Sequence, residues 1–271
     1  MRIRIIIPSR LHPDYINAEM CDLLRRELPA CGEAEIVDLS PDIVHIFGIW
    51  NSSFAKRVEA YRNIGVPVVF TSLDGILSLK KSSGGNTHSI TPTAAVRRVA
   101  KSGAIIHVCG KFDRSTIIEV AKYADVRIIS NASHTATTDT ATMTAQTIDL
   151  YRETIDTADR LTREKINKKL DKIDITDHTI RDICSRILYI KQRFIMCNLP
   201  QVYLDQTSHL LINSDYNEKE MRNVLEQLKL TRFAAYTMTL LAESSTLTEG
   251  FMPLESDSGK TVEKMKKYII K

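Results

Sequence analysis

Residues 40–50 read SPDIVHIFGIW, and this stretch decides the fold class. Between Ile43 and Phe47 every residue is apolar except His45, and the run ends shortly before Trp50, the only tryptophan of the chain. A short apolar run without polar alternation is typical of a strand buried on both faces, as in a parallel sheet. The stretch therefore predicts a buried strand with Trp50 just past its end.

Five other runs of the same kind flank this strand, with helix-length segments among them. We expect strands at residues 2–8, 34–39, 43–47, 66–71, 104–109 and 126–130. Helical spacing of apolar residues predicts helices at residues 18–28, 53–64, 93–101 and 114–124. This alternation predicts an α/β fold: a Rossmann-like open parallel sheet with right-handed crossovers and helices on both faces. Residues 82–92 are polar, contain a Gly-Gly pair and are expected to form a loop.

After residue 131 the pattern changes to helices alone. Residues 143–155 have helical spacing, and from residue 165 onward no strand pattern appears. Further helices are expected at residues 180–194, 218–230, 233–241 and 262–270. The sequence therefore predicts an amino-terminal domain over residues 1–155 and a small all-α domain over residues 165–271.

Composition excludes several classes of protein. The chain has 271 residues and a net charge of +4, which is shared evenly between its two halves, so no basic patch for nucleic acid is indicated. No apolar run approaches the roughly 18 residues of a membrane span, and the initial apolar run is too short for a signal peptide. Five scattered cysteines, without a CxxC pair, favour a reducing cytoplasm. No metal-ligand spacing and no Walker, GxSxG or GxGxxG motif occurs, so neither metal nor cofactor is expected.

Four segments follow one another in an order that is known from one enzyme family: PDIVHIFGIW, VPVVFTSLDG, IIHVCGKFDRSTI and VRIISNAS. Together they resemble the amino-terminal domain of family 4-type retaining glycosyltransferases, which have two Rossmann domains (the GT-B architecture). That family has a PDIVHxHGxW segment, a strand ending in a Thr-x-x-His-Gly turn, an IHVxSxFE segment and a strand ending in Pro-Asn-Gly. The resemblance covers residues 41–133.

Residues 141–155, ATMTAQTIDLYRETI, resemble the last helix of the same family. In the family this helix follows the donor-binding domain and crosses back to the amino-terminal one. Here it begins about ten residues after the last predicted strand, where a domain of roughly a hundred residues or more would be expected. The resemblance thus implies a glycosyltransferase half that lacks the sugar-nucleotide domain, and the region after residue 165 has no counterpart.

The resemblance implies a ligand cleft at the carboxyl edge of the sheet, where open α/β sheets bind their ligands. Trp50 would lie beside the acceptor site, or else it packs against the sheet. The Lys pair at positions 80 and 81 would receive an anionic ligand, or else it belongs to a solvated loop. The candidate ligand-binding residues are Arg10, His12, Trp50, Asp74, Gly75, Lys80 and Lys81.

Several departures from the family pattern argue against catalysis. The first strand leads into PSRLHPDY, which lacks the glycine-rich turn that lets backbone N–H groups approach phosphate. Phe47 replaces the second histidine of the HxHG pattern, and Asp74 replaces the histidine of the Thr-x-x-His-Gly turn. An ionised carboxylate only accepts hydrogen bonds and repels phosphate. His45 and His107 match the family, but both lie in apolar strands and are expected to be core residues. No catalytic residue is predicted.

Three functions remain open at this point. The chain is a glycosyltransferase-like binding or regulatory module without activity, a weak sugar- or nucleotide-binding protein, or half of an enzyme whose donor domain comes from a partner chain. We expect the first. The helical domain would then engage a protein partner or a second copy of the chain, and the possible ligand is a sugar or sugar nucleotide.

Overall fold

The computed structural model describes residues 1–9, 15, 17–75, 91–130, 139–257 and 259–270. The chain divides into two compact units, Met1–Ala158 and Asp159–Lys271. The boundary falls inside one continuous helix, α6 (Thr140–Leu170). Each unit is built around its own apolar core.

The first unit contains a six-stranded sheet in which every strand pair is parallel. The strand order is β2-β1-β3-β4-β5-β6. The strands are β1 (Arg2–Ile6), β2 (Glu35–Ile36), β3 (Ile43–Gly48), β4 (Val68–Ser72), β5 (Ile105–Val108) and β6 (Val126–Ile128). The predicted α/β fold with an open parallel sheet is therefore confirmed, and β3 is fully buried.

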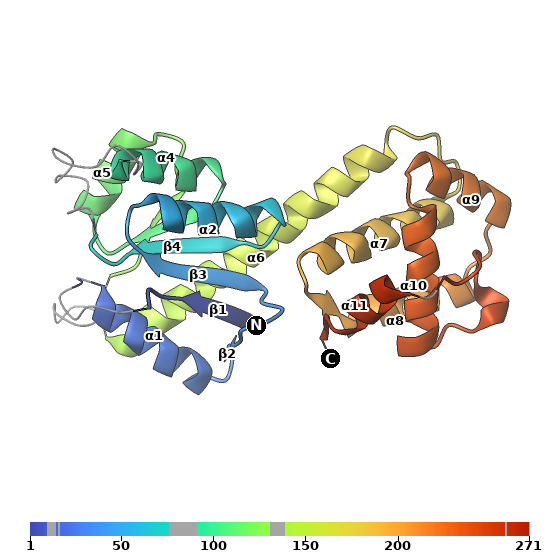
Figure 1. Cartoon of the computed structure of the whole chain (residues 1–271), viewed down its shortest axis with the longest axis horizontal. Coiled ribbons are helices and arrows are strands. Elements are labelled where there is room, and N and C mark those ends of the chain that lie inside the picture. The colour runs from blue at the N-terminus through green and yellow to red at the C-terminus, as the bar shows by residue number, and fades with distance from the viewer. Residues whose placement is uncertain (10–14, 16, 76–90, 131–138, 258, 271) are drawn as a thin grey trace. The chain divides into compact units, whose positions relative to one another are not determined.

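Helices cover both faces of this sheet (Figure 1). Side chains alternate between the faces along a strand, so Ile43, His45 and Phe47 share one face, which packs against α1 (Ala18–Ala30) and α6. The opposite face, with Phe70, is covered by α2 (Ser52–Asn63) and α4 (Pro92–Lys101). The helix α5 (Lys111–Val120) packs beside β6 and α4.

The second unit is mainly helical. Its elements after α6 are α7 (His178–Ile195), α8 (Gln201–Asn213), α9 (Glu218–Gln227), α10 (Thr231–Ser244), η1 (Glu249–Phe251) and α11 (Lys260–Lys266). Leucine, isoleucine, valine and methionine side chains from these helices form its core. Helices were expected at the positions of α7, α9, α10 and α11.

Two details of this unit differ from the sequence prediction. The helix α8 was not predicted, because two of its four buried residues are the polar Thr207 and Ser208, which interrupt the apolar period. The terminal helix ends at Lys266, and residues 269–270 instead form β8 (Ile269–Ile270), which pairs in parallel with β7 (Leu199–Pro200). The backbone N–H of Leu199 donates to the carbonyl of Tyr268 at 2.9 Å, so a short strand pair supplements the helices.

Gly48 provides a test of how tightly β3 packs against α2. A Cβ at this position would lie 2.5 Å from Cδ1 of Phe54, a ring that is itself buried. Because overpacking a core costs about 1–3 kcal/mol, Gly48→Ala is expected to lower the free energy of unfolding of the first unit by that amount. The measurement is urea unfolding followed by the fluorescence of Trp50.

The matched control is Gly110→Ser. A Cβ at Gly110 meets no atom within 4 Å, and Gly110 is the N-cap residue of α5, a position that favours serine. This variant is expected to unfold at the wild-type urea concentration or slightly above it. Equal midpoints for the wild type and Gly48→Ala would contradict the packing described here.

Candidate functional site at the carboxyl edge of the sheet

The strand order creates a switch point between β1 and β3. These strands are neighbours in the sheet although β2 lies between them in the sequence, so later strands are added on the opposite side of β1. In open α/β sheets, ligands bind outside the carboxyl ends of the strands at such a point. Trp50 follows the carboxyl end of β3, and this edge is therefore the candidate site.

Trp50 connects the end of β3 to the turn that follows β4. Its indole Nε1–H donates to the carbonyl of Gly75 at 3.0 Å, and its ring packs on Phe70 with 4.6 Å between ring centroids. Only 3% of the residue is exposed. Most of the indole surface is thus used in packing, and a ligand at this edge would meet little more than its rim.

The turn formed by residues 72–75 holds a carboxylate at the edge. The backbone N–H of Gly75 donates to the carbonyl of Ser72 at 3.3 Å, and Gly75 has a φ of 58°, a conformation that favours glycine. Within the turn, Ser72 Oγ donates to Asp74 Oδ1 at 2.6 Å. The backbone N–H of Leu73 donates to the carbonyl of Gly48 at 2.7 Å, which fixes the turn against β3. Asp74 is therefore positioned by its own turn and remains partly exposed.

Asn17, which precedes α1, joins this helix to the ends of two strands. Its side-chain Nδ2 donates to the carbonyl of Ser72 at 2.6 Å, and its Oδ1 accepts from Cys109 Sγ at 3.1 Å. Its backbone N–H donates to the carbonyl of Leu73 at 3.1 Å. Only 4% of Asn17 is exposed, so it is a buried polar residue that stabilises the turn at this edge through its hydrogen bonds. The sequence analysis missed it, because its partners lie 55 and 92 residues away.

Three of the expected ligand-binding residues lie together at this edge: Trp50, Asp74 and Gly75. Their role in ligand binding stays a prediction. The other expected residues lie outside the described part of the chain: Arg10, His12, Lys80 and Lys81.

A chain of polar side chains runs through the sheet face that packs against α6. Tyr151 Oη lies 2.5 Å from His45 Nδ1, and His45 Nε2 lies 2.7 Å from Thr71 Oγ1. Thr71 Oγ1 in turn lies 2.8 Å from His107 Nδ1. His107 Nε2 lies 3.1 Å from the carbonyl of Ile129. This series of hydrogen bonds links α6, β3, β4, β5 and the end of β6 inside the core.

The direction of every hydrogen bond in this chain follows from its last member. The carbonyl of Ile129 only accepts, so His107 Nε2 carries a proton, and in a neutral ring Nδ1 then accepts from the hydroxyl of Thr71. With its proton used, Thr71 Oγ1 accepts from Nε2–H of His45. Nδ1 of His45 therefore accepts from the hydroxyl of Tyr151. Both rings are thus neutral Nε2–H tautomers, and every donor has one acceptor.

Burial keeps these side chains in the protonation states that this series of hydrogen bonds requires. Desolvation lowers the pKa of His45 well below its ordinary value, with a further contribution from His107. It lowers the pKa of His107 to about 4, against a smaller opposing effect of the bond to Ile129. It also raises the pKa of Tyr151, which stays a hydroxyl and a donor. The interpretation of both histidines as hydrogen-bonded core residues is confirmed, since 1% of His45 and 2% of His107 are exposed.

Comparison of the chain with protein-family models, with curated proteins and with solved structures found no match. In the described ranges, no group of three or more His, Cys, Asp or Glu residues is placed to hold a metal ion. Among the helices that the structure describes, none combines the length and the apolar character needed to cross a membrane.

The buried histidines predict how the stability of the first unit depends on pH. In the unfolded chain a histidine binds a proton near pH 6.5, whereas folded His107 does so only near pH 4. The contribution of neutral His107 to the free energy of unfolding is thus fully present above pH 6.5. It is lost as the pH falls toward 4, where the free energy of unfolding is lower by about 3 kcal/mol. Urea unfolding at a series of pH values, followed by Trp50 fluorescence, measures this loss.

The control for this prediction is His107→Gln. A glutamine accepts through Oε1 and donates through Nε2, so it can keep both hydrogen bonds, but it does not titrate. Between pH 6.5 and pH 4, we expect the free energy of unfolding of the variant to fall by about 3 kcal/mol less than that of the wild type. The same pH dependence in both proteins would contradict a neutral, buried His107.

Proposed function

We propose that the protein is a glycosyltransferase-like binding module that does not catalyse sugar transfer. One observation carries this proposal. The two histidines that occupy positions of the family pattern, His45 and His107, are buried, neutral and fully hydrogen-bonded within the core. They are not available to donate to or accept from a substrate, and general acid–base catalysis requires a group within hydrogen-bond reach of the reacting atoms.

The arrangement of the second unit supports the same conclusion. A retaining transfer needs cationic or backbone donors for the departing diphosphate, since negative charge develops there. In the resembling family these come mostly from a second Rossmann domain. In its described residues, the second compact unit of this chain consists of helices and one two-stranded sheet, β7-β8, rather than a Rossmann domain. Donor-site residues of the family's kind therefore have no counterpart among the elements described.

The carboxyl edge supports the binding part of the proposal. Asp74 uses Oδ1 to accept from Ser72, and a carboxylate has further acceptor capacity beyond one bond. Sugar hydroxyls are suitable donors for it, whereas the phosphates of a nucleotide would be repelled. We therefore place the sugar part of the ligand next to Asp74, at the switch point of the sheet, with the rim of Trp50 beside it.

Titration of the purified chain with UDP-, GDP- and TDP-sugars, the free nucleotides and the free sugars tests this proposal. We expect saturable heat for a sugar or sugar nucleotide, together with a change in the emission of Trp50, and no release of nucleotide over hours of incubation. Asp74→Asn is expected to weaken binding at least tenfold, because a hydrogen bond to a charged group is worth about 1.5–3 kcal/mol and about 1.4 kcal/mol corresponds to a factor of ten.

The matched control is Asp149→Asn, which removes a carboxylate that is 74% exposed and paired with Arg152 on α6. It is expected to bind as the wild type does. Turnover of any sugar nucleotide would overturn the non-catalytic part of the proposal. Absence of heat and of a Trp50 response with every compound would overturn the binding part.

A further inference from the structure

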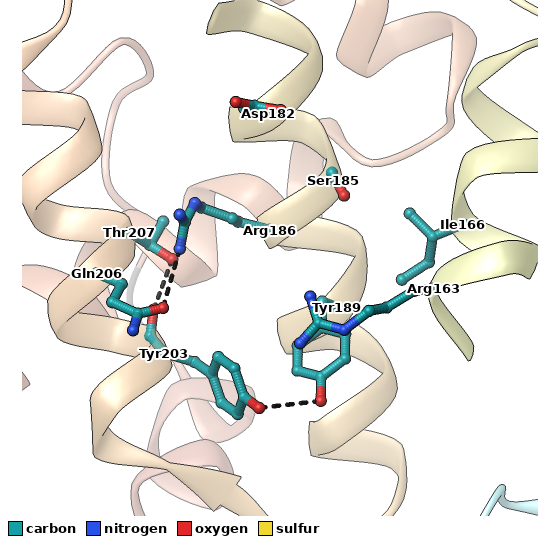
Figure 2. Close-up of a pocket in the computed structure, with 9 residues that line it drawn as sticks. All are labelled: Arg163, Ile166, Asp182, Ser185, Arg186, Tyr189, Tyr203, Gln206 and Thr207. Atoms are coloured by element: carbon teal, nitrogen blue, oxygen red, sulfur yellow. Dashed lines mark hydrogen bonds between the residues drawn. The ribbon is translucent and has the colours of Figure 1, made fainter. Parts of the chain in front are cut away.

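We propose that the helical unit holds a separate binding site for a small hydroxylated oxyanion, that is, a metabolite with one carboxylate or phosphate group and at least one hydroxyl. The site is a pocket of about 230 Å³ whose lining comes from the second half of α6, from α7 and from α8 (Figure 2). All its lining residues belong to the unit Asp159–Lys271. The proposal is independent of the carboxyl edge of the sheet.

Two arginines line the pocket, and their charges are balanced differently. Arg163 Nε donates to Asp159 Oδ2 at 2.8 Å, and its guanidinium lies over the ring of Tyr189, 4.8 Å from the centroid. Arg186 Nη1 donates to Gln206 Oε1 at 3.2 Å, a neutral partner. Figure 2 shows Arg186 directed toward Gln206 on α8 and away from Asp182, the acidic residue in the lining. A positive charge at this pocket therefore faces a neutral amide.

No ion pair to Arg186 is found within the described ranges of the chain. A guanidinium has five N–H donors in a planar fork that matches the oxygens of a carboxylate or phosphate. The bond to Gln206 Oε1 uses one of them. Gln206 also carries its own amide N–H groups next to the fork. This end of the pocket thus offers donors and positive charge, which is what an oxyanion requires.

A tyrosine hydroxyl at the other end of the pocket acts as an acceptor (Figure 2). Tyr189 donates its proton to Asp159 Oδ1, so in its 3.2 Å contact with Tyr203 the donor is Tyr203. The hydroxyl of Thr207, which lies at the Arg186 end, is fully buried and donates to the backbone carbonyl of Tyr203 at 2.6 Å. With its proton donated to Tyr189, the oxygen of Tyr203 has lone pairs left for a donor of a ligand. A ligand hydroxyl fits this end.

Size restricts the ligand further. Pockets for drug-sized ligands measure roughly 300–1,000 Å³, and this one has about 230 Å³. A nucleotide is too large to be enclosed here, so the ligand is smaller than the sugar nucleotides considered for the first unit. Glycerol phosphate and glycerate have the required groups at this size.

Calorimetric titration of the full chain with inorganic phosphate, glycerol phosphate and glycerate, at constant ionic strength, tests the proposal. We expect saturable binding of glycerol phosphate or glycerate, and the stronger of the two identifies the charged group. Arg186→Gln, which keeps amide donors but removes the charge, is expected to weaken binding at least tenfold. Tyr203→Phe is expected to weaken binding of the hydroxylated probe but not of inorganic phosphate.

The matched control is Arg160→Gln, which removes an exposed arginine of the same unit that pairs with Glu164. It is expected to bind as the wild type does, and circular dichroism checks that every variant folds. A dissociation constant of 10 mM corresponds to about 2.7 kcal/mol of standard binding free energy. Absence of binding by all three probes up to this concentration would overturn the proposal. Equal affinities in the wild type and Arg186→Gln, or equal losses in Arg186→Gln and Arg160→Gln, would also overturn it.

Discussion

The first unit depends on a line of directed hydrogen bonds that crosses its core from Tyr151 to the carbonyl of Ile129. Polar groups in an apolar core cost about 1–3 kcal/mol each when unpaired, and here each has its partner because both imidazoles are neutral and share one tautomer. The bonds join three neighbouring strands to α6 on one sheet face. They give this face a specificity that apolar packing alone does not supply, because a shift of one residue in any strand would remove a partner.

The same strands end at the candidate ligand edge, where a second group of polar contacts takes over. Asn17 and Trp50 hold the turn after β4 through the carbonyls of Ser72 and Gly75, and they leave Asp74 partly exposed. The two histidines, which could otherwise act in acid–base catalysis, are thus hydrogen-bonded inside the core, whereas the edge presents the carboxylate of Asp74. This division is the physical basis for proposing binding without catalysis. The pocket next to Arg186 adds a site of opposite charge in the helical unit.

The strands could be predicted from the sequence, because a run such as residues 43–47 is apolar on both faces and needs no knowledge of its neighbours. The buried state of His45 followed from the same run. Its partner Tyr151 did not, since the two residues are 106 positions apart and a tyrosine on an apolar helix face has many possible partners. Asn17 and the pocket on α7 and α8 were missed for the same reason. In α8, Thr207 and Ser208 are buried in place of apolar residues and conceal its period.

The measurement that tests the central claim most directly is the protonation of the two buried imidazoles, read from long-range ¹H–¹⁵N correlation spectra at pH 7. We expect His45 and His107 each to have a protonated Nε2 and an unprotonated Nδ1, with no change in either ring between pH 8 and pH 5.5. An Nδ1–H tautomer or an imidazolium at either position would reverse or break the chain of hydrogen bonds. It would contradict the explanation given for this core and for the proposed absence of catalysis.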